Sequence, residues 1–325
     1  MNHFTVATLP LSTALNLHET FFCGQAFRWH ALALSTNTAY YAALDGTLVL
    51  LYAQSSTLTV YASAPVLQHR PLAEFMHHYL GLTDRLEEVF SPLFRQKYPH
   101  LVQGAAPYFG LRLLRQPAFE TLISFMCAQG IGIALIRRQV AALARTFGSP
   151  LSLSISLSPS GQLTPHFSFA ITEYTFPTPE CLAEASLSQL QRCTNFHRAR
   201  AERIRRIARA VADGSLNLAA LTAPHATFEH ARETLLQYDG IGEKIADCIC
   251  LFGLGHHEAF PIDTHVRQYL AEWFGLKAPT TSLTPRAYRE LAQAARDILG
   301  TKYAGLAGQW LFHHWRRDIR KMRDY

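Results

Sequence analysis

The sequence lacks the long apolar runs of a membrane-spanning protein. None of its 325 residues belongs to a run of roughly 18 or more consecutive apolar residues, whereas a helix needs roughly 20 to cross a bilayer. The N-terminal region also lacks a basic segment followed by an apolar block, which is the pattern of a secretory leader. We therefore expect an intracellular protein that has no membrane partner.

Cysteines at metal-ligand spacing are missing as well. The six cysteines are scattered through apolar segments, where we expect them to be buried thiols. No group of them has the close spacing of a zinc or iron–sulfur site. They are Cys23, Cys127, Cys181, Cys193, Cys248 and Cys250. The sequence thus predicts neither a metal centre nor another cofactor.

Lysine is scarce, whereas arginine is abundant. Only five of the thirty basic residues are lysines, and the formal net charge is +6. Arginines are concentrated in residues 198–209 and 316–323. Their planar guanidinium groups suit phosphate contacts, and the charge fits a polyanionic partner such as nucleic acid. A solvated helix face would give the same clusters, so charge alone does not identify the partner.

The hydropathy periodicity changes near residue 110. Before it, apolar residues alternate with polar ones in short segments bounded by turn signals such as Asp45-Gly46, which predicts antiparallel strands. The predicted strands span residues 4–9, 38–43, 47–52 and 57–61, and the predicted helices span 72–79 and 84–94. We expect an α+β protein. An N-terminal antiparallel β-sheet domain with helices would occupy residues 1–110, and a mostly α-helical domain would occupy residues 111–325.

Two irregular segments interrupt the helical half. A Gly130-Ile131-Gly132 break separates two segments with helical spacing. Residues 149–179 are rich in serine and proline and contain two short predicted strands. We interpret this second segment as an excursion from the helical body, followed by a helix that ends at about Cys193.

The segment between residues 235 and 266 has the strongest functional pattern. Gly240 and Gly242 lie between two apolar-periodic segments, so a tight hairpin between two helices is predicted. The second helix should begin directly after Gly242, with Lys244 in its first turn. Backbone N–H groups at that N-terminus can bind a phosphate. Asp263 should lie at or near the N-cap of a further helix.

These residues resemble the helix-hairpin-helix glycosylase superfamily, and in particular its 8-oxoguanine DNA glycosylase branch. The hairpin lysine is followed by Asp247-Cys-Ile-Cys250, and the later loop has the form Pro261-x-Asp263-x-His265. Near the N-terminus, Gly24-Gln-Ala-Phe-Arg-Trp29 resembles the Gly-Gln-x-Phe-Arg-Trp signature of the same family. A Gly-x-Gly pair alone is common in turns between helices. The lysine and the Pro-x-Asp-x-His loop at this distance make the resemblance specific.

The resemblance implies a catalytic pair and a base-reading carbonyl. Lys244 would attack the sugar C1′ as a neutral amine and form a Schiff base, and Asp263 would stabilise the positively charged sugar. The backbone carbonyl of Gly24 would accept a hydrogen bond from N7–H of 8-oxoguanine. The same ring position is a bare acceptor in guanine, so this contact would favour the lesion.

Further positions complete the base site that the resemblance implies. Cys248 and Phe312 would face the two sides of the flipped base, and His265 would contact a phosphate. The family's final helix also carries a glutamine that reads the Watson–Crick edge, but that position is Gly308 here. Gln309 lies one residue on, about 100° around the helix. Either Gln309 reaches in from a shifted helix, or recognition differs.

The predicted DNA-facing loops also depart from the family pattern. Gly130-Ile131-Gly132 replaces an asparagine triplet, and the apolar Ile131 could insert into the base stack as a wedge. Leu135 replaces an arginine, which puts reading of the opposite cytosine in question. His197 replaces a tyrosine wedge, and Arg198 follows it. The predicted DNA contacts are therefore Gly240, Gly242, Ile131, His197 and Arg198.

The pattern predicts a base-excision-repair DNA glycosylase with AP lyase activity. It would act as a monomer on double-stranded DNA, flip out an oxidised purine, chiefly 8-oxoguanine, and nick the strand by β-elimination. Two alternatives stay open. One is a glycosylase of the same fold for another lesion, such as an alkylated purine, which base release from defined lesions would identify. The other is a non-catalytic helix-hairpin-helix DNA-binding protein, for which Lys244→Gln would change nothing.

Overall fold

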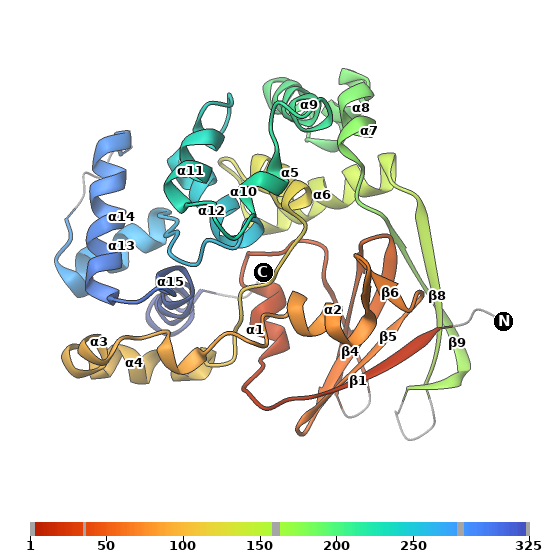
Figure 1. Cartoon of the computed structure of the whole chain (residues 1–325), viewed down its shortest axis with the longest axis horizontal. Helices are drawn as coiled ribbons and strands as arrows, with labels where there is room; N and C mark the ends of the chain where they lie inside the picture. Colours follow the sequence, from red (N-terminus) through yellow and green to blue (C-terminus); the bar gives the residue numbers. More distant parts are fainter. Residues whose placement is uncertain (1–3, 35–36, 158–162, 278–282, 323–325) are drawn as a thin grey trace.

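A β-sheet and a larger body of helices divide the chain between them (Figure 1). The computed structural model describes residues 4–34, 37–157, 163–277 and 283–322, with the backbone alone for residues 153–157 and 163–170. The strands of the main sheet all come from the first third of the chain, and most helices come from the rest. This arrangement confirms the predicted fold class.

Five antiparallel strands form the main sheet, in the order β1-β5-β4-β3-β2. The strands are Thr5–Pro10 (β1), His30–Ala33 (β2), Thr38–Leu44 (β3), Thr47–Gln54 (β4) and Thr57–Ala62 (β5). Four of them were predicted from alternating hydropathy. Strand β2 was missed because its four residues are too few for a clear alternation. A small second hairpin pairs Val66–Leu67 (β6) with Arg70–Pro71 (β7).

One face of the main sheet is covered by two helices, α1 (Leu17–Phe22) and α2 (Leu72–Tyr79). The core between them is aromatic, and the rings of Phe21 and Trp29 stack with centroids 3.8 Å apart. Trp29 also donates a hydrogen bond of 3.0 Å from Nε1 to the hydroxyl of Tyr79 on α2. Helix α1 leads directly into the Gly-Gln-x-Phe-Arg-Trp segment, so this packing fixes where that segment lies.

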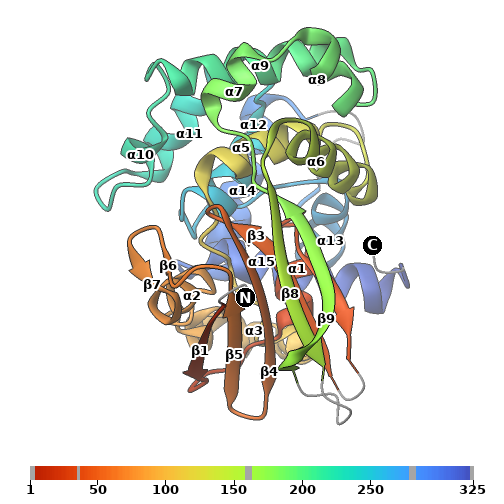
Figure 2. The ribbon, with the colours of Figure 1, turned by 90° about the vertical axis from the view of Figure 1, so that its right-hand side faces the viewer.

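The other face of the sheet is covered by a long hairpin of β8 (Pro150–Leu157) and β9 (Leu163–Tyr174), which Figure 2 shows lying across the strands. Ile171 of β9 packs against Ala39, Leu48 and Leu50 of the sheet. This contact explains why the middle of β4 is buried on both faces. The serine- and proline-rich excursion from the helical body therefore completes the second apolar face of the sheet.

Two predicted helices are each divided in the structure. The segment 84–94 contains only a 3-10 turn, Leu86–Glu88, before Ser91 caps a new helix, Pro92–Lys97 (α3). The segment ending at Cys193 consists of Pro179–Glu184 (α7) and Leu187–Cys193 (α8). In both places a serine side chain accepts a hydrogen bond from the backbone N–H three residues later, which starts a separate helix. The hydropathy pattern alone did not reveal these caps.

The remaining helices form the larger body around one apolar core. They are Pro99–Ala105 (α4), a 3-10 turn Ala106–Tyr108, Ala118–Cys127 (α5), Ile133–Phe147 (α6), Arg198–Ala212 (α9), Leu218–Leu221 (α10), Phe228–Leu236 (α11), Glu243–Gly253 (α12), Thr264–Phe274 (α13), Pro285–Leu299 (α14), Ala304–His313 (α15) and a π-helix His314–Ile319 (η3). Among the described residues, no helix is both long enough and apolar enough to span a bilayer.

Candidate active site

The predicted hairpin joins α11 to α12 and presents the N-terminus of α12. Gly240 adopts φ +90°, a backbone conformation that favours glycine. A Cβ there would also lie 2.6 Å from Cδ of Arg203, so the arginine side chain would have to shift. Gly242 is the N-cap of α12 and offers no side-chain cap. The first N–H groups of α12 therefore stay available to an anion. Helix α12 begins at Glu243, as predicted, and places Lys244 in its first turn.

Asp263 is the N-cap of α13, as predicted. Its Oδ1 accepts a hydrogen bond of 2.8 Å from the backbone N–H of Val266. This contact fixes the orientation of the carboxylate and satisfies one otherwise unpaired N–H group of the helix. The cap uses Oδ1, and the carboxylate lines both hollows described below.

A cavity of about 250 Å³ lies between the sheet domain and the helices. This volume is near the lower end of small-molecule pockets, and we call the hollow the base-sized cavity. Most of its walls are apolar, including Phe125 and Phe252. The predicted substrate residues that line it are Gly24, Cys248, His265, Gln309 and Phe312. Sequence positions nearly three hundred residues apart thus meet in one small cavity.

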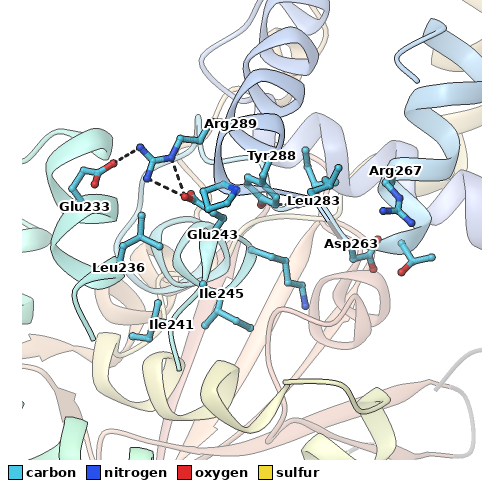
Figure 3. Close-up of a pocket in the computed structure, with 15 residues that line it drawn as sticks. Glu233, Leu236, Ile241, Glu243, Ile245, Asp263, Arg267, Leu283, Tyr288 and Arg289 are labelled. Atoms are coloured by element: carbon cyan, nitrogen blue, oxygen red, sulfur yellow. Dashed lines mark hydrogen bonds and ion pairs between the residues drawn. The ribbon is translucent and has the colours of Figure 1, made fainter. Parts of the chain in front are cut away.

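A second, larger hollow adjoins this cavity. It is an open groove of about 950 Å³ between α11, α12, α13 and α14, and Figure 3 draws its lining residues. Arg267 and Asp263 come from α13 and its cap, and Leu283 and Tyr288 lie opposite. Lys244 and Asp263 line both hollows. The predicted catalytic pair therefore stands where the base-sized cavity opens into the groove.

The thiol in the cavity wall is neutral. Burial raises the pKa of Cys248 to about 12, and the same cause raises the pKa of Cys23 to about 12 at the other end of the cavity. Both thiols therefore keep their protons at neutral pH and contribute apolar surface to the cavity. The expectation of buried thiols is confirmed for five of the six cysteines, and Cys181 is half-buried.

Glu243, the neighbour of Lys244, is held in a buried ion-pair network. Arg232 and Arg289 both contact its carboxylate, and Arg289 also pairs with Glu233 at 2.8 Å (Figure 3). Arg232 contacts Asp247 as well, at 3.0 Å. These two arginines balance the charge of Glu243 on the side of α12 away from the base-sized cavity. The sequence gave no sign of this pairing, because the partners come from three different helices.

The loop that carries Gly24 is fixed by two glutamines, the buried Gln25 and the half-buried Gln116. The Gln25 side chain donates to the carbonyls of Thr20 (2.7 Å) and Arg112 (2.8 Å) and accepts from the N–H of Leu114 (2.9 Å). Gln116 donates to the carbonyl of Gln25 at 2.7 Å. Every polar atom of the Gln25 side chain is used, so the backbone beside it has little freedom. A rigid carbonyl at Gly24 can discriminate between a donor and an acceptor.

The final helix has no room for a side chain at position 308. A Cβ on Gly308 would lie 2.6 Å from Cε2 of Phe260. Gln309, one residue on, lines the base-sized cavity, and its Oε1 is buried with no hydrogen-bond partner among the described residues. Gln309 thus faces the cavity, and its reading of the base stays a prediction.

Of the two predicted wedge residues, Ile131 lies differently from expectation, and the DNA contact of both stays a prediction. Ile131 is half-buried in the wall of the base-sized cavity rather than at an exposed tip, because its side chain packs against the core. His197 is exposed but serves as the N-cap of α9, where Nδ1 accepts from the N–H of Arg200 at 3.2 Å. The neighbouring Phe196, which the sequence did not single out, is 74% exposed and adopts φ +58°.

The arginines of α9 divide into two groups. Arg200 is buried and donates to the carbonyl of Gln129 at 2.6 Å, while Gln129 in turn contacts the carbonyl of Gly240. These bonds tie the N-terminus of α9 to the 129–132 loop and to the hairpin. Arg198 is exposed and pairs with Glu202 on the same helix. Of the second basic cluster, Arg323 lies outside the described residues.

Two family models match the chain in succession. Residues 8–122 match the N-terminal domain of 8-oxoguanine DNA glycosylase. Residues 123–294, more than half of the chain, match the HhH-GPD superfamily of base excision DNA repair proteins. The junction between the two models lies within α5.

Relatives and solved structures agree with these models. The N-glycosylase/DNA lyase OGG1 of Arabidopsis thaliana is 29% identical over 306 residues, which cover 92% of this chain and 77% of that protein. A structure of MBOgg1 with a low-affinity DNA ligand has a TM-score of 0.76 and 26% identity, covering 98% of this chain and 99% of that one. The apo structure of the 8-oxoguanine glycosylase/lyase of Clostridium acetobutylicum has a TM-score of 0.74 and 24% identity, and so shares the fold. The match covers 95% of this chain and 96% of that one.

Proposed function

The chain belongs to the HhH-GPD superfamily of base excision DNA repair proteins, and from that premise we propose that it excises 8-oxoguanine and nicks the DNA through an imine on Lys244. It is a DNA glycosylase and lyase that acts on DNA as its partner. Recognition of the damaged base, the roles of individual residues and a monomeric state are parts of this proposal.

The observation that carries the proposal is the position of the catalytic pair. Lys244 and Asp263 line both the base-sized cavity and the groove beside the hairpin. A nucleotide with its base in the cavity and its backbone in the groove would place the glycosidic bond between these two side chains. Attack at C1′ requires a nucleophile at that junction, since the sugar lies between the base and the phosphate backbone.

Lys244 and Asp263 supply the nucleophile and the carboxylate that the reaction needs. The neutral amine of Lys244 attacks C1′, and the bond from C1′ to the base breaks as the base leaves with the electron pair and takes a proton. Asp263 stabilises the positive charge that develops on the sugar. Loss of the amine proton and opening of the sugar ring give the imine. Removal of a C2′ proton then breaks the C3′–O bond and nicks the strand, and water releases the product from Lys244.

Recognition of the base would use two groups from opposite ends of the chain. The Gly24 carbonyl, fixed through Gln25, accepts from N7–H of 8-oxoguanine. The amide of Gln309, which has a buried acceptor without a partner, reads the Watson–Crick edge. Phe312 and Cys248 provide the flat apolar walls on either side. Guanine lacks the N7 proton and would leave the Gly24 carbonyl unpaired, which costs roughly 1–3 kcal/mol.

DNA would be held through backbone groups and a few exposed side chains. The N–H groups that follow Gly242 bind a phosphate of the damaged strand, and His265 contacts another. Arg198 lies on the exposed side of α9, next to Phe196. An exposed aromatic ring can insert between bases and hold the duplex bent after the lesion has flipped out.

Borohydride trapping tests this function. Wild-type protein, Lys244→Gln and the control Lys302→Gln, an exposed lysine outside both hollows, are incubated with a duplex that contains 8-oxoguanine opposite cytosine. We expect a covalent protein–DNA band for wild type and Lys302→Gln and none for Lys244→Gln. If trapping occurs at a preformed abasic site but not at 8-oxoguanine, the result supports the lyase activity and rejects 8-oxoguanine as the lesion. No band with either substrate would reject the imine mechanism.

Excision of an alkylated purine is the second candidate function. The absence of a side chain at Gly308 and the apolar 130–132 loop both depart from the pattern of the 8-oxoguanine branch. A duplex with 7-methylguanine in place of 8-oxoguanine, in the same sequence and opposite cytosine, distinguishes the two. Base release from this duplex, with none from the 8-oxoguanine duplex, would favour the second candidate.

A further inference from the structure

A buried arginine packs against the ring of Phe312, which forms one wall of the base-sized cavity. Cζ of Arg316 lies over the Phe312 ring, 5.3 Å from the centroid. Arg316 is 4% exposed and is not among the described residues that line the cavity. The guanidinium therefore stands behind the ring as seen from the base site, within the distance of a cation–π interaction.

An unusual local backbone brings Arg316 to this place. Helix α15 ends at His313 and continues directly as a π-helix, His314–Ile319, which contains Arg316. The π-helix is rare, and short π segments are frequent at functional sites. The edge of the same Phe312 ring is contacted by His265, with centroids 6.1 Å apart and planes at 68°. The ring is thus held in one orientation, with a cation behind it.

We propose that Arg316 makes this site selective for neutral, electron-rich purines and against cationic, N-alkylated ones. The inference rests on the proposed function, since it assumes that a flipped base stacks on Phe312. Arg316 is a positioning and specificity-determining residue here, because it acts through the ring and does not touch the base.

The selectivity follows because an aromatic ring that already interacts with one cation attracts a second cation on its other face less strongly. Arg316 draws electron density of the Phe312 ring toward its own face, which leaves the cavity face less negative. An electron-rich neutral purine stacks better on such a face. A cationic purine would lose part of the cation–π attraction to this face.

Equilibrium binding by a protein that cannot turn over tests the inference. The full chain with Lys244→Gln is titrated with three duplexes that differ in one base opposite cytosine: 8-oxoguanine, guanine or 7-methylguanine. The measured quantity is the ratio of the dissociation constants for 7-methylguanine and 8-oxoguanine. We expect that adding Arg316→Met lowers this ratio about threefold to tenfold. Adding Arg316→Lys, which keeps the charge, should retain most of the ratio.

Arg320→Met is the matched control. Arg320 lies one residue beyond the π-helix, is exposed and stacks over Trp315 at 5.8 Å, so this change also removes one arginine from an aromatic ring. The ratio should not change, because Trp315 is not part of the cavity. A ratio within twofold of the parent value in a folded Arg316→Met protein would overturn the inference.

Two further measurements keep the outcomes distinct. If Arg316→Met does not fold, Phe312→Leu and Phe312→Leu with Arg316→Gln are compared. Without an aromatic ring, removal of the arginine charge should leave the ratio unaltered, and an altered ratio contradicts the inference. If the Lys244→Gln parent does not prefer 8-oxoguanine over guanine, the proposed function fails instead. Trapping at an abasic site, which has no base to stack, should be unaffected by Arg316→Met in the chain that retains Lys244.

Discussion

Asp263 combines a structural and a chemical role in one side chain. Its Oδ1 caps α13, and its carboxylate charge stands beside Lys244 at the mouth of the base-sized cavity. An asparagine can make the same cap but carries no charge, whereas an alanine can do neither. The two roles are therefore separable by mutation.

We predict that Asp263→Asn lowers single-turnover excision of 8-oxoguanine by at least about a hundredfold, with little change in melting temperature. Asp263→Ala should lower excision similarly and also lower the free energy of unfolding by about 1 kcal/mol. Stopped reactions and thermal melting measure the two effects. Equal melting temperatures for Asn and Ala would show that the cap has no energetic importance.

Phe196 lies in a conformation that a bulky residue rarely adopts. Its φ is +58°, and its neighbour Asn195 has φ +53°. Such strain persists where surrounding structure or function maintains it. The ring is 74% exposed, so packing against the protein does not explain it. The DNA contact proposed above would explain it, because an exposed apolar side chain can insert into a base stack.

We predict that Phe196→Gly raises the free energy of unfolding by about 0.5–1 kcal/mol, because glycine tolerates positive φ. The same change should weaken binding to a duplex with an abasic-site analogue at least about fivefold, through loss of stacking. Leu93→Ala removes another exposed apolar side chain, on α3, far from α9 in Figure 1, and should change neither quantity. Unchanged affinity in Phe196→Gly would exclude the ring as a DNA contact.

At the scale of the element, α12 carries Lys244, the proposed catalytic lysine, at its start and a buried carboxyl one turn later. Burial raises the pKa of Asp247 from 3.8 to about 7, against the attraction of Arg232. Tyr288, whose pKa burial raises well above its usual range, donates a hydrogen bond of 3.0 Å to Oδ2 of Asp247. In the unfolded chain the same carboxyl ionises near its ordinary value. Folding is therefore linked to proton uptake by Asp247.

The sign of the pH dependence follows from that linkage. Between about pH 4 and pH 7 the folded protein holds a proton on Asp247 that the unfolded chain has lost, so this group's contribution to stability falls as pH rises. We predict that the melting temperature of Asp247→Asn, relative to wild type, becomes steadily higher from pH 4 to pH 7. Asp213→Asn is the control, since the hydrogen bonds of Ser215 lower the pKa of Asp213 below this window. A flat difference for Asp247→Asn would contradict the linkage.

At the scale of the whole molecule, the base-sized cavity exists only where the two halves of the chain meet. Helix α1 leads to Gly24, and α15 carries Gln309 and Phe312. Between these walls Glu19 contacts Arg317 and lies 3.8 Å from Nδ1 of His313. Burial lowers the pKa of His313 to about 3, so that imidazole is neutral and Arg317 balances the charge of Glu19.

We predict that Glu19→Gln lowers the free energy of unfolding by about 1–3 kcal/mol, because it weakens a largely buried ion pair. It should also slow excision of 8-oxoguanine several-fold while leaving borohydride trapping at a preformed abasic site unchanged, since an abasic site does not need both cavity walls. Glu87→Gln, on the surface, is the control for both readouts. Equal losses on the two substrates would indicate a general loss of folded protein.

Local sequence rules predicted the elements that depend on neighbouring residues. The glycine pair, the start of α12 at Glu243 and the cap at Asp263 follow from backbone conformation and hydrogen bonding within a few residues. Alternation predicted four strands of the sheet for the same reason. The divided helices at Ser91 and Ser186 were missed because an apolar periodicity continues across a cap.

The family resemblance located the candidate site. Tertiary packing determined which departures from the family pattern affect the shape of that site. Phe260 leaves no space for a side chain at Gly308, and only the fold makes this visible, since the two residues are 48 positions apart. Packing likewise placed Ile131 in the cavity wall and left Phe196 exposed. No local pattern encodes such contacts, because each depends on the relative positions of several helices.

The sequence by itself thus determined the α+β class, the hairpin and the positions of Lys244 and Asp263 along their helices, because short-range geometry sets these features. The tertiary structure alone decided that both residues stand at the junction of a base-sized cavity and a groove. It also decided that two arginines neutralise Glu243 and that Arg316 stands behind Phe312. The reason is that cavities and buried charge pairs form between elements, and their geometry depends on how the whole chain packs.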